Sequence, residues 1–259
     1  MLVAVDIGNS RVKCASFVRG RILARHHAPT EACESTADLV RLLQAATESA
    51  ADRDALDIAY ASVVPRVRPR LIEAAANIGA RTLTEVRHDS NLGLELAVES
   101  PQAMGPDRIA NAIGAVAVLG APVTIVDFGT AITTTVVTQD RRVIGGSISP
   151  GVRTSARALS VFTGRLPEVA VSDRVTLPDP IGNDTVPAIE SGILYGTIGA
   201  VKELLRRINE QLGVPMPTIA TGGMACLLAP HCGISNVDQD LTFRGIREAA
   251  VRSGAGIAG

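Results

Sequence analysis

Two stretches of the chain share one pattern of apolar and polar positions. An apolar run near the N-terminus ends at Asp6-Ile7-Gly8, and a second run in mid-chain ends at Asp127-Phe128-Gly129. This pattern predicts a buried strand followed by a tight turn, where Gly lets the backbone approach a ligand closely. Each turn then reaches a hydroxyl residue, Ser10 or Thr130. Because turn N–H groups and hydroxyls bind phosphate oxygens, and a carboxylate can hold hydrated Mg²⁺, the pattern indicates phosphate binding.

The repeat continues past both turns with a constant offset of 121 residues, the separation of Asp6 and Asp127. Residues 3–23 and 124–144 both predict strand, turn, strand, turn and strand. One Asp-x-Gly turn alone would be an ordinary strand end, but a gapless echo is typical of an internal repeat. The arrangement resembles the duplicated ribonuclease-H-like fold of the acetate and sugar kinases, actin and the Hsp70 ATPase. That resemblance implies an α/β fold with two such domains, residues 1–120 and 121–259, and a cleft between them.

Helices and strands alternate through the rest of the chain. Apolar spacing and start signals predict helices near residues 36–46, 70–78, 109–119, 152–159, 185–212 and 244–252, and strands near 56–64, 81–86 and 217–220. Residues 145–151 are expected to form a Gly-rich turn, and residues 163–180 a loop. The helix at 109–119 is so apolar that it must be buried on several sides. The helix at 185–212 has one face of small residues, which favours either close packing within the chain or a dimer interface.

Composition and charge exclude several classes of partner. Hydrophobic residues make up 46% of the 259 residues, whereas aromatic residues make up only 2%, which argues against stacking on nucleic-acid bases. The net charge of −1 is evenly spread, so nucleic acids and membrane surfaces are not expected partners. The chain begins with a predicted strand rather than a signal peptide, and it has no apolar run of roughly 18 residues. A cytoplasmic location is therefore expected.

Three acids stand where phosphoryl transfer to an alcohol would need them. The reaction requires neutralised phosphate charge and an acceptor for the alcohol proton. Asp6 and Asp127 follow strands and would face phosphates and cations. Asp107 is interpreted as the proton acceptor at a helix N-terminus, with a plain helix N-cap as the alternative. Arg108 would hold an anionic group of the acceptor, and Lys13 is either a phosphate ligand or a solvated strand residue.

Several segments, in the same order, resemble the motif series of the type III pantothenate kinases. The main ones are residues 6–13, Gly105-Pro106-Asp107-Arg108-Ile109-Ala110-Asn111, residues 127–131, residues 145–151 and residues 184–192. Residues 163–167, Thr221-Gly222-Gly223 and Asp240-Leu241-Thr242 fit the series as well. The match spans nearly the whole chain. Several ordered motifs are far more specific than a single Asp-x-Gly turn.

The resemblance implies ATP-dependent phosphorylation of pantothenate to 4'-phosphopantothenate, the first step of coenzyme A biosynthesis. It implies that ATP is bound by Asp6, Ile7, Gly8, Asn9, Ser10, Arg11, Val12, Lys13 and Thr130. It implies that pantothenate is bound by Gly105, Pro106, Asp107 and Arg108, and by Thr185 of the neighbouring subunit in a homodimer. Asp107 would be the catalytic base. Asp127 would bind a monovalent cation, K⁺ or NH₄⁺, and Asp6 would hold Mg²⁺ through water.

Two positions depart from the family pattern. The family often has a Tyr in the pantothenate pocket a few residues before the Pro that precedes its Gly-x-Asp-Arg motif, and Val98 takes that place here. The shape of the pocket and its affinity for pantothenate therefore depend on Val98. Pro106 replaces a residue that is usually small, but Pro is compatible with the first turn of a helix.

Two other functions explain part of the pattern. Another phosphotransferase of the same fold, acting on acetate, a sugar or polyphosphate, explains both Asp-x-Gly turns but neither the segment at Gly105 nor Thr185. A non-catalytic regulator that binds nucleotide or pantothenate should lack a catalytic acid or carry a basic DNA-binding surface. All three acids are present and the net charge is −1, so an enzyme is favoured.

Overall fold

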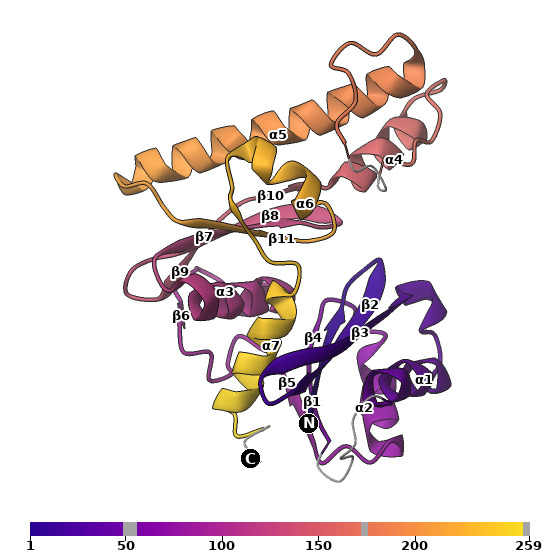
Figure 1. The fold of residues 1–259 in the computed structure, drawn as a ribbon, viewed down its shortest axis with the longest axis vertical. Helices are drawn as coiled ribbons and strands as arrows, with labels where there is room; N and C mark the ends of the chain where they lie inside the picture. The colour runs from indigo at the N-terminus through magenta and orange to yellow at the C-terminus, as the bar shows by residue number, and fades with distance from the viewer. Residues whose placement is uncertain (49–55, 172–175, 256–259) are drawn as a thin grey trace. The chain divides into compact units, whose positions relative to one another are not determined.

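The two copies of the repeated pattern form the same strands in the computed structural model, which describes residues 1–48, 56–171 and 176–255 (Figure 1). The first copy forms β1 (Leu2–Ile7), β2 (Arg11–Val18) and β3 (Arg21–Pro29). The second copy forms β7 (Val123–Phe128), β8 (Ala131–Val137) and β9 (Arg142–Gly145). Strands β1 and β7 match residue for residue at the offset of 121, which is the distance from Leu2 to Val123. The repeat predicted from the sequence is confirmed.

The chain divides into two compact units. The first contains Met1–Ala121, Thr138–Ile144 and Asp240–Gly259, and the second contains Pro122–Val137 and Gly145–Gln239. The chain first passes between them one residue beyond Gly120, the expected domain boundary. The second unit nevertheless differs from the expected domain 121–259, because the C-terminal helix α7 (Leu241–Arg252) packs along α3 (Pro106–Leu119) in the first unit.

A five-stranded sheet forms the centre of the first unit, in the order β3-β2-β1-β4-β5. Its remaining strands are β4 (Asp57–Ser62) and β5 (Thr82–Glu85), and β1 runs parallel to β4. Helices α1 (Thr36–Thr47) and α2 (Arg68–Asn77) cover one face, where they enclose Val3, Val5 and Ile7. Helices α3 and α7 contact the same strands from the other side (Figure 1). Because side chains alternate along a strand, Asp6 lies on the side of α3 and α7.

Helix ends follow their local sequence signals. Ser35 and Asp38 form a capping box at the start of α1, and Gly120 ends α3 with a φ of 81°. Residues 109 to 115 of α3 are all buried, as the apolar pattern predicts. Helix α7 begins at Leu241, three residues before the predicted start near 244, because Leu241 and Phe243 are already buried against the unit.

The second unit contains the strands β8-β7-β11-β12 of a seven-stranded sheet, and their order corresponds to β2-β1-β4-β5 in the first unit. The new strands are β11 (Thr218–Thr221), which is parallel to β7, and β12 (Asn236–Val237). Helices α4 (Val152–Phe162), α5 (Thr185–Leu212) and α6 (Ala225–Leu228) enclose the core beside this sheet (Figure 1). The predicted turn at 145–151 contains a short strand, β10 (Ile148–Pro150). It forms because Thr134 of β8 donates its N–H to the Ser147 carbonyl and continues the ladder.

Shorter elements complete the description. Strand β6 (Glu95–Leu96) pairs with β9 in the first unit, and the 3-10 helices are η1 (Thr30–Ala32), η2 (Pro101–Ala103) and η3 (Pro230–Cys232). Strands β6 and β12 were not predicted, because two residues are too few for a periodic signal. None of the helices in the described part of the chain is long and apolar enough to span a membrane.

Candidate active site

Asp6 is a buried carboxylate near the end of β1. Asp6 is only 8% exposed, and the Nζ atom of Lys13 on the adjacent strand lies 3.4 Å from the Oδ2 atom of Asp6. Antiparallel pairing of β1 with β2 places the two residues directly opposite each other. The ion pair shows that Lys13 is more than a solvated strand residue. Lys13 itself is half-exposed, which leaves its ammonium group accessible to a ligand.

The turn after β1 is held in place by a residue from η1. The N–H of Gly8 donates to the carbonyl of Arg11 at 3.0 Å and closes the turn. The hydroxyl of Thr30 donates to the carbonyl of Gly8 at 2.7 Å, and the N–H of Thr30 donates to the carbonyl of Ser10. Asn9 and Ser10 at the tip are exposed. A fixed turn with an exposed tip suits phosphate binding.

Asp107 is the second residue of α3 rather than its N-cap. The N-cap is Gly105, followed by Pro106 in the first turn. The Oδ1 atom of Asp107 accepts a hydrogen bond from the N–H of Arg108 at 2.8 Å. Asp107 therefore satisfies one of the free N–H groups at the start of the helix, and Asp107 itself stays partly exposed. The positive end of the helix dipole lies at this end of α3, beside the carboxylate.

Four charged groups influence one another at this end of the first unit. Burial raises the pKa of Asp6, Lys13 opposes that rise, and the nearby carboxylate of Asp107 adds to it. Burial lowers the pKa of Arg108, and the carboxylate of Asp107 opposes this change. The two carboxylates supply oxygen ligands of the kind that suit Mg²⁺.

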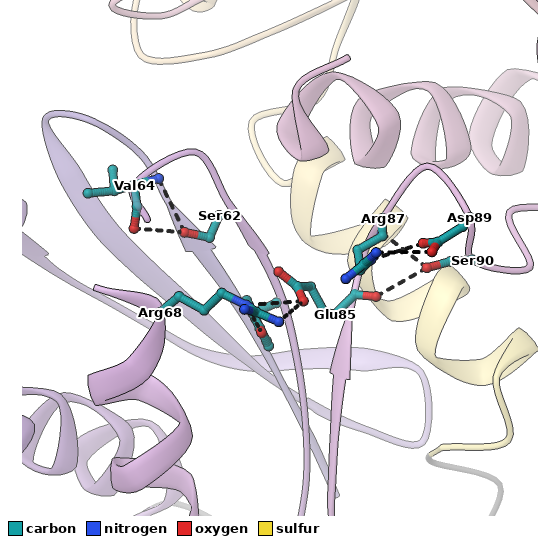
Figure 2. A network of polar contacts seen from close by, with 8 residues as sticks. Ser62, Val64, Arg68, Glu85, Arg87, Asp89 and Ser90 are labelled. Carbon is teal, nitrogen blue, oxygen red and sulfur yellow. Dashed lines mark hydrogen bonds and ion pairs between the residues drawn. The ribbon is translucent and has the colours of Figure 1, made fainter. Parts of the chain in front are cut away.

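A polar network supports the loop between β4 and α2. Arg68 donates to the Tyr60 hydroxyl at 3.1 Å and to Glu85 at 2.7 Å, as Figure 2 shows in part. The hydroxyl of Ser62 accepts from the N–H of Val64 at 3.2 Å in the same view (Figure 2). Between them, Val63 donates its N–H to the carbonyl of Ile7. The loop is thereby fixed beside the end of β1.

Asp127 lies at the corresponding position of β7 in the second unit. Thr221 of β11 pairs opposite it, and the turn that follows packs onto its carboxylate. A Cβ atom on Gly222, whose φ is +94°, would lie 2.4 Å from the Oδ1 atom of Asp127. The N–H of Met224 donates to the carbonyl of Phe128 at 3.3 Å. The backbone at Gly222 therefore packs closely against the Asp127 carboxylate, while Asp127 stays partly exposed.

Thr130 is an exposed residue at the next turn, where its carbonyl fixes the start of α4. That carbonyl accepts from the N–H of Gly151 at 3.0 Å and from the hydroxyl of Thr154 at 2.6 Å. A Cβ atom on Gly151 would lie 2.2 Å from the carbonyl oxygen of Gly129. The Gly-rich motif before α4 therefore allows the backbone to pack tightly against the turn after β7.

Val98 and Thr185, the two remaining candidate residues for pantothenate binding, lie on other segments of the chain. Val98 lies in the first unit between β6 and η2 and is partly buried. Thr185 is the exposed first residue of α5, and Asp184 caps that helix by accepting its N–H at 2.6 Å. The hydroxyl of Ser191 in α5 donates to the carbonyl of Pro180 at 2.7 Å and holds the preceding loop.

The predicted residues fall into two groups, one in each unit. Lys13 pairs with Asp6 in the first unit, where the charge of Asp107 also acts on Asp6, and Asp127 and Thr130 lie at the end of β7 and in the turn after it in the second. Sequence reasoning missed Thr30 and the role of Gly222. No local signal marks Thr30, because the carbonyl that it holds is 22 residues away. No cluster of three or more His, Cys, Asp or Glu side chains occurs in residues 1–48, 56–171 and 176–255.

The sequence matches one family model and curated relatives along most of its length. The model of type III pantothenate kinase matches residues 2–207. The type III pantothenate kinase of Rhodospirillum rubrum is 36% identical over 252 residues, covering 95% of this chain and 96% of that protein. The type III pantothenate kinase of Thermomicrobium roseum is 37% identical over 255 residues, covering 97% of each chain.

Solved structures share the fold at much lower identity. A Campylobacter jejuni protein described as a Baf family transcriptional activator has a TM-score of 0.60 at 20% identity, over 97% of this chain and 98% of that chain. MreB 5 of Spiroplasma citri bound to AMPPNP has a TM-score of 0.55 at 9% identity, over 98% and 97%. These similarities concern the fold alone, and they confirm the actin-like fold predicted from the repeat. The family model and the relatives at 36% and 37% identity show that the chain belongs to the type III pantothenate kinase family.

Proposed function

We propose that this chain transfers a phosphoryl group from ATP to the primary hydroxyl of pantothenate and forms 4'-phosphopantothenate, the first step of coenzyme A biosynthesis. Its membership of the type III pantothenate kinase family is the observation that carries the proposal. The carboxylate of Asp107 beside Asp6 and Lys13 supports it further. Phosphoryl transfer needs charge neutralisation and a proton acceptor, and these residues supply both.

Asp107 is the proposed proton acceptor. Its carboxylate lies at the N-terminus of α3, is partly exposed and has Arg108 as its neighbour. Gly105, Pro106 and Arg108 would bind pantothenate around it, and Val98 would line the same pocket. Arg108 would pair with an anionic group of the substrate, because its fixed planar fork matches a carboxylate.

Cations would compensate the phosphate charge at two positions. Asp6 would hold Mg²⁺ through water. Its buried carboxylate is paired with the half-exposed ammonium group of Lys13. Asp127 would contribute to a monovalent cation site for K⁺ or NH₄⁺, where the Gly222 turn packs onto its carboxylate. The turn at residues 8–10, the side chain of Lys13 and Thr130 would bind ATP.

A homodimer would complete the pantothenate site through Thr185 of the neighbouring subunit. Thr185 is exposed at the start of α5, and the exposed face of that helix contains Gly192, Gly196 and Gly199. Phe162 and Ile181 close to this region in sequence are 86% and 85% exposed. Apolar groups so exposed favour a partner surface. The proposed location is the cytoplasm, where ATP is available.

The test is ADP release from MgATP with and without pantothenate, in K⁺ buffer and again in Na⁺ buffer. Pantothenate-dependent release that requires K⁺ is the expected result. Asp107→Asn should keep the fold and nucleotide binding and abolish transfer. Absence of turnover from folded protein in both buffers would overturn the proposed reaction, and near-normal turnover of Asp107→Asn would remove Asp107 from its role.

A further inference from the structure

Helix α7 packs unusually closely against the helix that carries Asp107. A Cβ atom on Gly245 of α7 would lie 1.7 Å from the carbonyl oxygen of Ala110, and one on Gly114 of α3 would lie 2.4 Å from the carbonyl oxygen of Leu241. Neither position tolerates a side chain without moving backbone. The two glycines therefore bring the helix backbones into direct contact. Any displacement of α7 must be transmitted to α3.

One polar contact fixes the register of this packing. The hydroxyl of Thr242 in α7 donates a hydrogen bond to the Oδ1 atom of Asn111 in α3 at 2.7 Å. Asn111 is only 2% exposed, so the strength of this bond is little reduced by water. Asn111 follows Asp107 by four residues, which places both side chains on the same face of the helix. The bond is one helical turn from the proposed base.

Helix α7 is itself anchored at the opposite side. Arg25 of β3 forms a bidentate ion pair with Asp240 at the start of α7, with distances of 2.7 and 2.6 Å. The guanidinium of Arg247 lies 5.9 Å from the ring centroid of Phe17 in β2. The hairpin of β2 and β3 also carries Lys13. Helix α7 thus connects the strand that carries Lys13 with the helix that carries Asp107, all within the first unit.

We propose that Thr242 and Asn111 are positioning residues for Asp107, through which α7 sets the orientation of the first turns of α3. The inference rests on the proposed role of Asp107 as the base. A proton acceptor must be held within a fraction of an ångström of its productive position, and misplacement by about 1 Å can cost about 100-fold in rate. The hydrogen bond between Thr242 and Asn111 holds that position.

Stability alone would not require a hydrogen bond between Thr242 and Asn111 at this place. Replacing both partners of a buried hydrogen bond by apolar groups of similar shape is nearly neutral for stability. A directional bond, however, fixes the orientation of the Asn111 side chain relative to α7, which apolar contacts alone do not. This difference separates the positioning role from a purely structural one.

The first experiment compares Thr242→Val with Thr242→Ser and with the matched control Thr47→Val. Thr47 lies in α1, and its hydroxyl donates to the carbonyl of Gln44 at 2.9 Å. We expect Thr242→Val to lower kcat about tenfold with the KM for ATP within about twofold of wild type, because binding of nucleotide does not need the base. Thr242→Ser should restore most of kcat. A kcat of Thr242→Val equal to that of Thr47→Val would overturn the proposal.

A second experiment separates rate from stability. The double variant Asn111→Leu with Thr242→Val removes both partners of this hydrogen bond, and its melting temperature is measured beside that of Thr242→Val. Its kcat should stay low, because the directional bond is still absent. Recovery of kcat together with the melting temperature would overturn the positioning role.

The proposed function can fail independently of this inference. If wild type phosphorylates pantothenate and Asp107→Asn does not, the reaction and its base stand, and the Thr242 series alone decides the inference. If wild type shows no pantothenate-dependent ADP release, the proposed function fails, and the positioning role fails with it.

Discussion

The carboxylate of Asp107 folds back over Gly105, so that its Oδ1 atom lies 2.4 Å from the position a Cβ on Gly105 would occupy. Both residues belong to the start of α3, one as its N-cap and the other as its second helical residue. The hydrogen bond from the N–H of Arg108 to the same oxygen fixes this arrangement. The absence of a side chain at position 105 is therefore a condition for the orientation of the proposed base.

Gly105→Ala should reduce activity much more than stability. The added methyl group meets the end of the Asp107 side chain rather than backbone, so the carboxylate rotates away and the helix persists. We expect kcat to fall about tenfold or more, with little change in the melting temperature. The control is Gly164→Ala, because no atom of the described residues lies within 4 Å of the Cβ position of Gly164. Unchanged kcat in Gly105→Ala would show that the orientation of Asp107 is not critical.

Gly222→Ala should disturb both the fold of the second unit and the proposed cation site. Gly222 has a φ of +94°, and its Cβ would lie 2.7 Å from backbone atoms of Phe128 as well as 2.4 Å from Asp127 Oδ1. The strained backbone alone costs about 1–3 kcal/mol. We expect a lower melting temperature and a higher K⁺ concentration for half-maximal activity. Gly223→Ala, with open space at its Cβ position, is the matched control for stability.

The buried carboxylate of Asp6 should make stability depend on pH. Because its folded-state pKa is raised above the ordinary value of 3.8, the folded state binds the proton more tightly than the unfolded state. The stability that Asp6 contributes is therefore fully present below pH 3.8, and it is lost as the pH rises through the raised folded-state pKa. Asp6→Asn should be more stable than wild type at pH 7, and the difference should shrink as the pH approaches 3.8 and falls below it. Chemical unfolding at a series of pH values measures this. A constant difference at all pH values would contradict the assignment of the effect to Asp6.

The sequence predicted features that depend on local patterns. The two Asp-x-Gly turns, the start of α5 near residue 185 and the buried face of α3 all follow from residues that are neighbours in the chain. Asp6 and Asp107 were both identified from their own turns. The effect of the Asp107 charge on the pKa of Asp6 could not be predicted, because it depends on the tertiary packing of β1 and α3.

Features that depend on distant contacts were not predicted. Thr242 and Asn111 are 131 residues apart, and nothing near either residue indicates the hydrogen bond between them. The return of α7 to the first unit follows from the close packing of Gly114 and Gly245 against carbonyl groups. A glycine in a helix has the same appearance in the sequence whether it meets backbone, as Gly245 does, or open space, as Gly196 does.

Gly196→Leu tests the proposed homodimer, because the effects of this substitution on the chain itself and on an interface have opposite signs. Nothing within the described chain lies within 4 Å of the Cβ position of Gly196, and the residue is in the interior of α5. In a monomer the substitution should stabilise the helix, since Leu exceeds Gly in helix propensity by up to about 1 kcal/mol. At a closely packed interface the same side chain would separate the two helices.

We therefore expect Gly196→Leu to convert a wild-type dimer into a monomer in analytical ultracentrifugation. Pantothenate phosphorylation should fall at the same time, because Thr185 would no longer reach the neighbouring site. Gln44→Leu places the same side chain on an exposed position of α1 in the first unit, and it should leave both association and activity unchanged. A wild-type protein that sediments as an active monomer would exclude any contribution of a partner's Thr185. If the wild type is a dimer and Gly196→Leu is an active monomer, the proposed homodimer stands, but Thr185 of the partner has no role in the reaction.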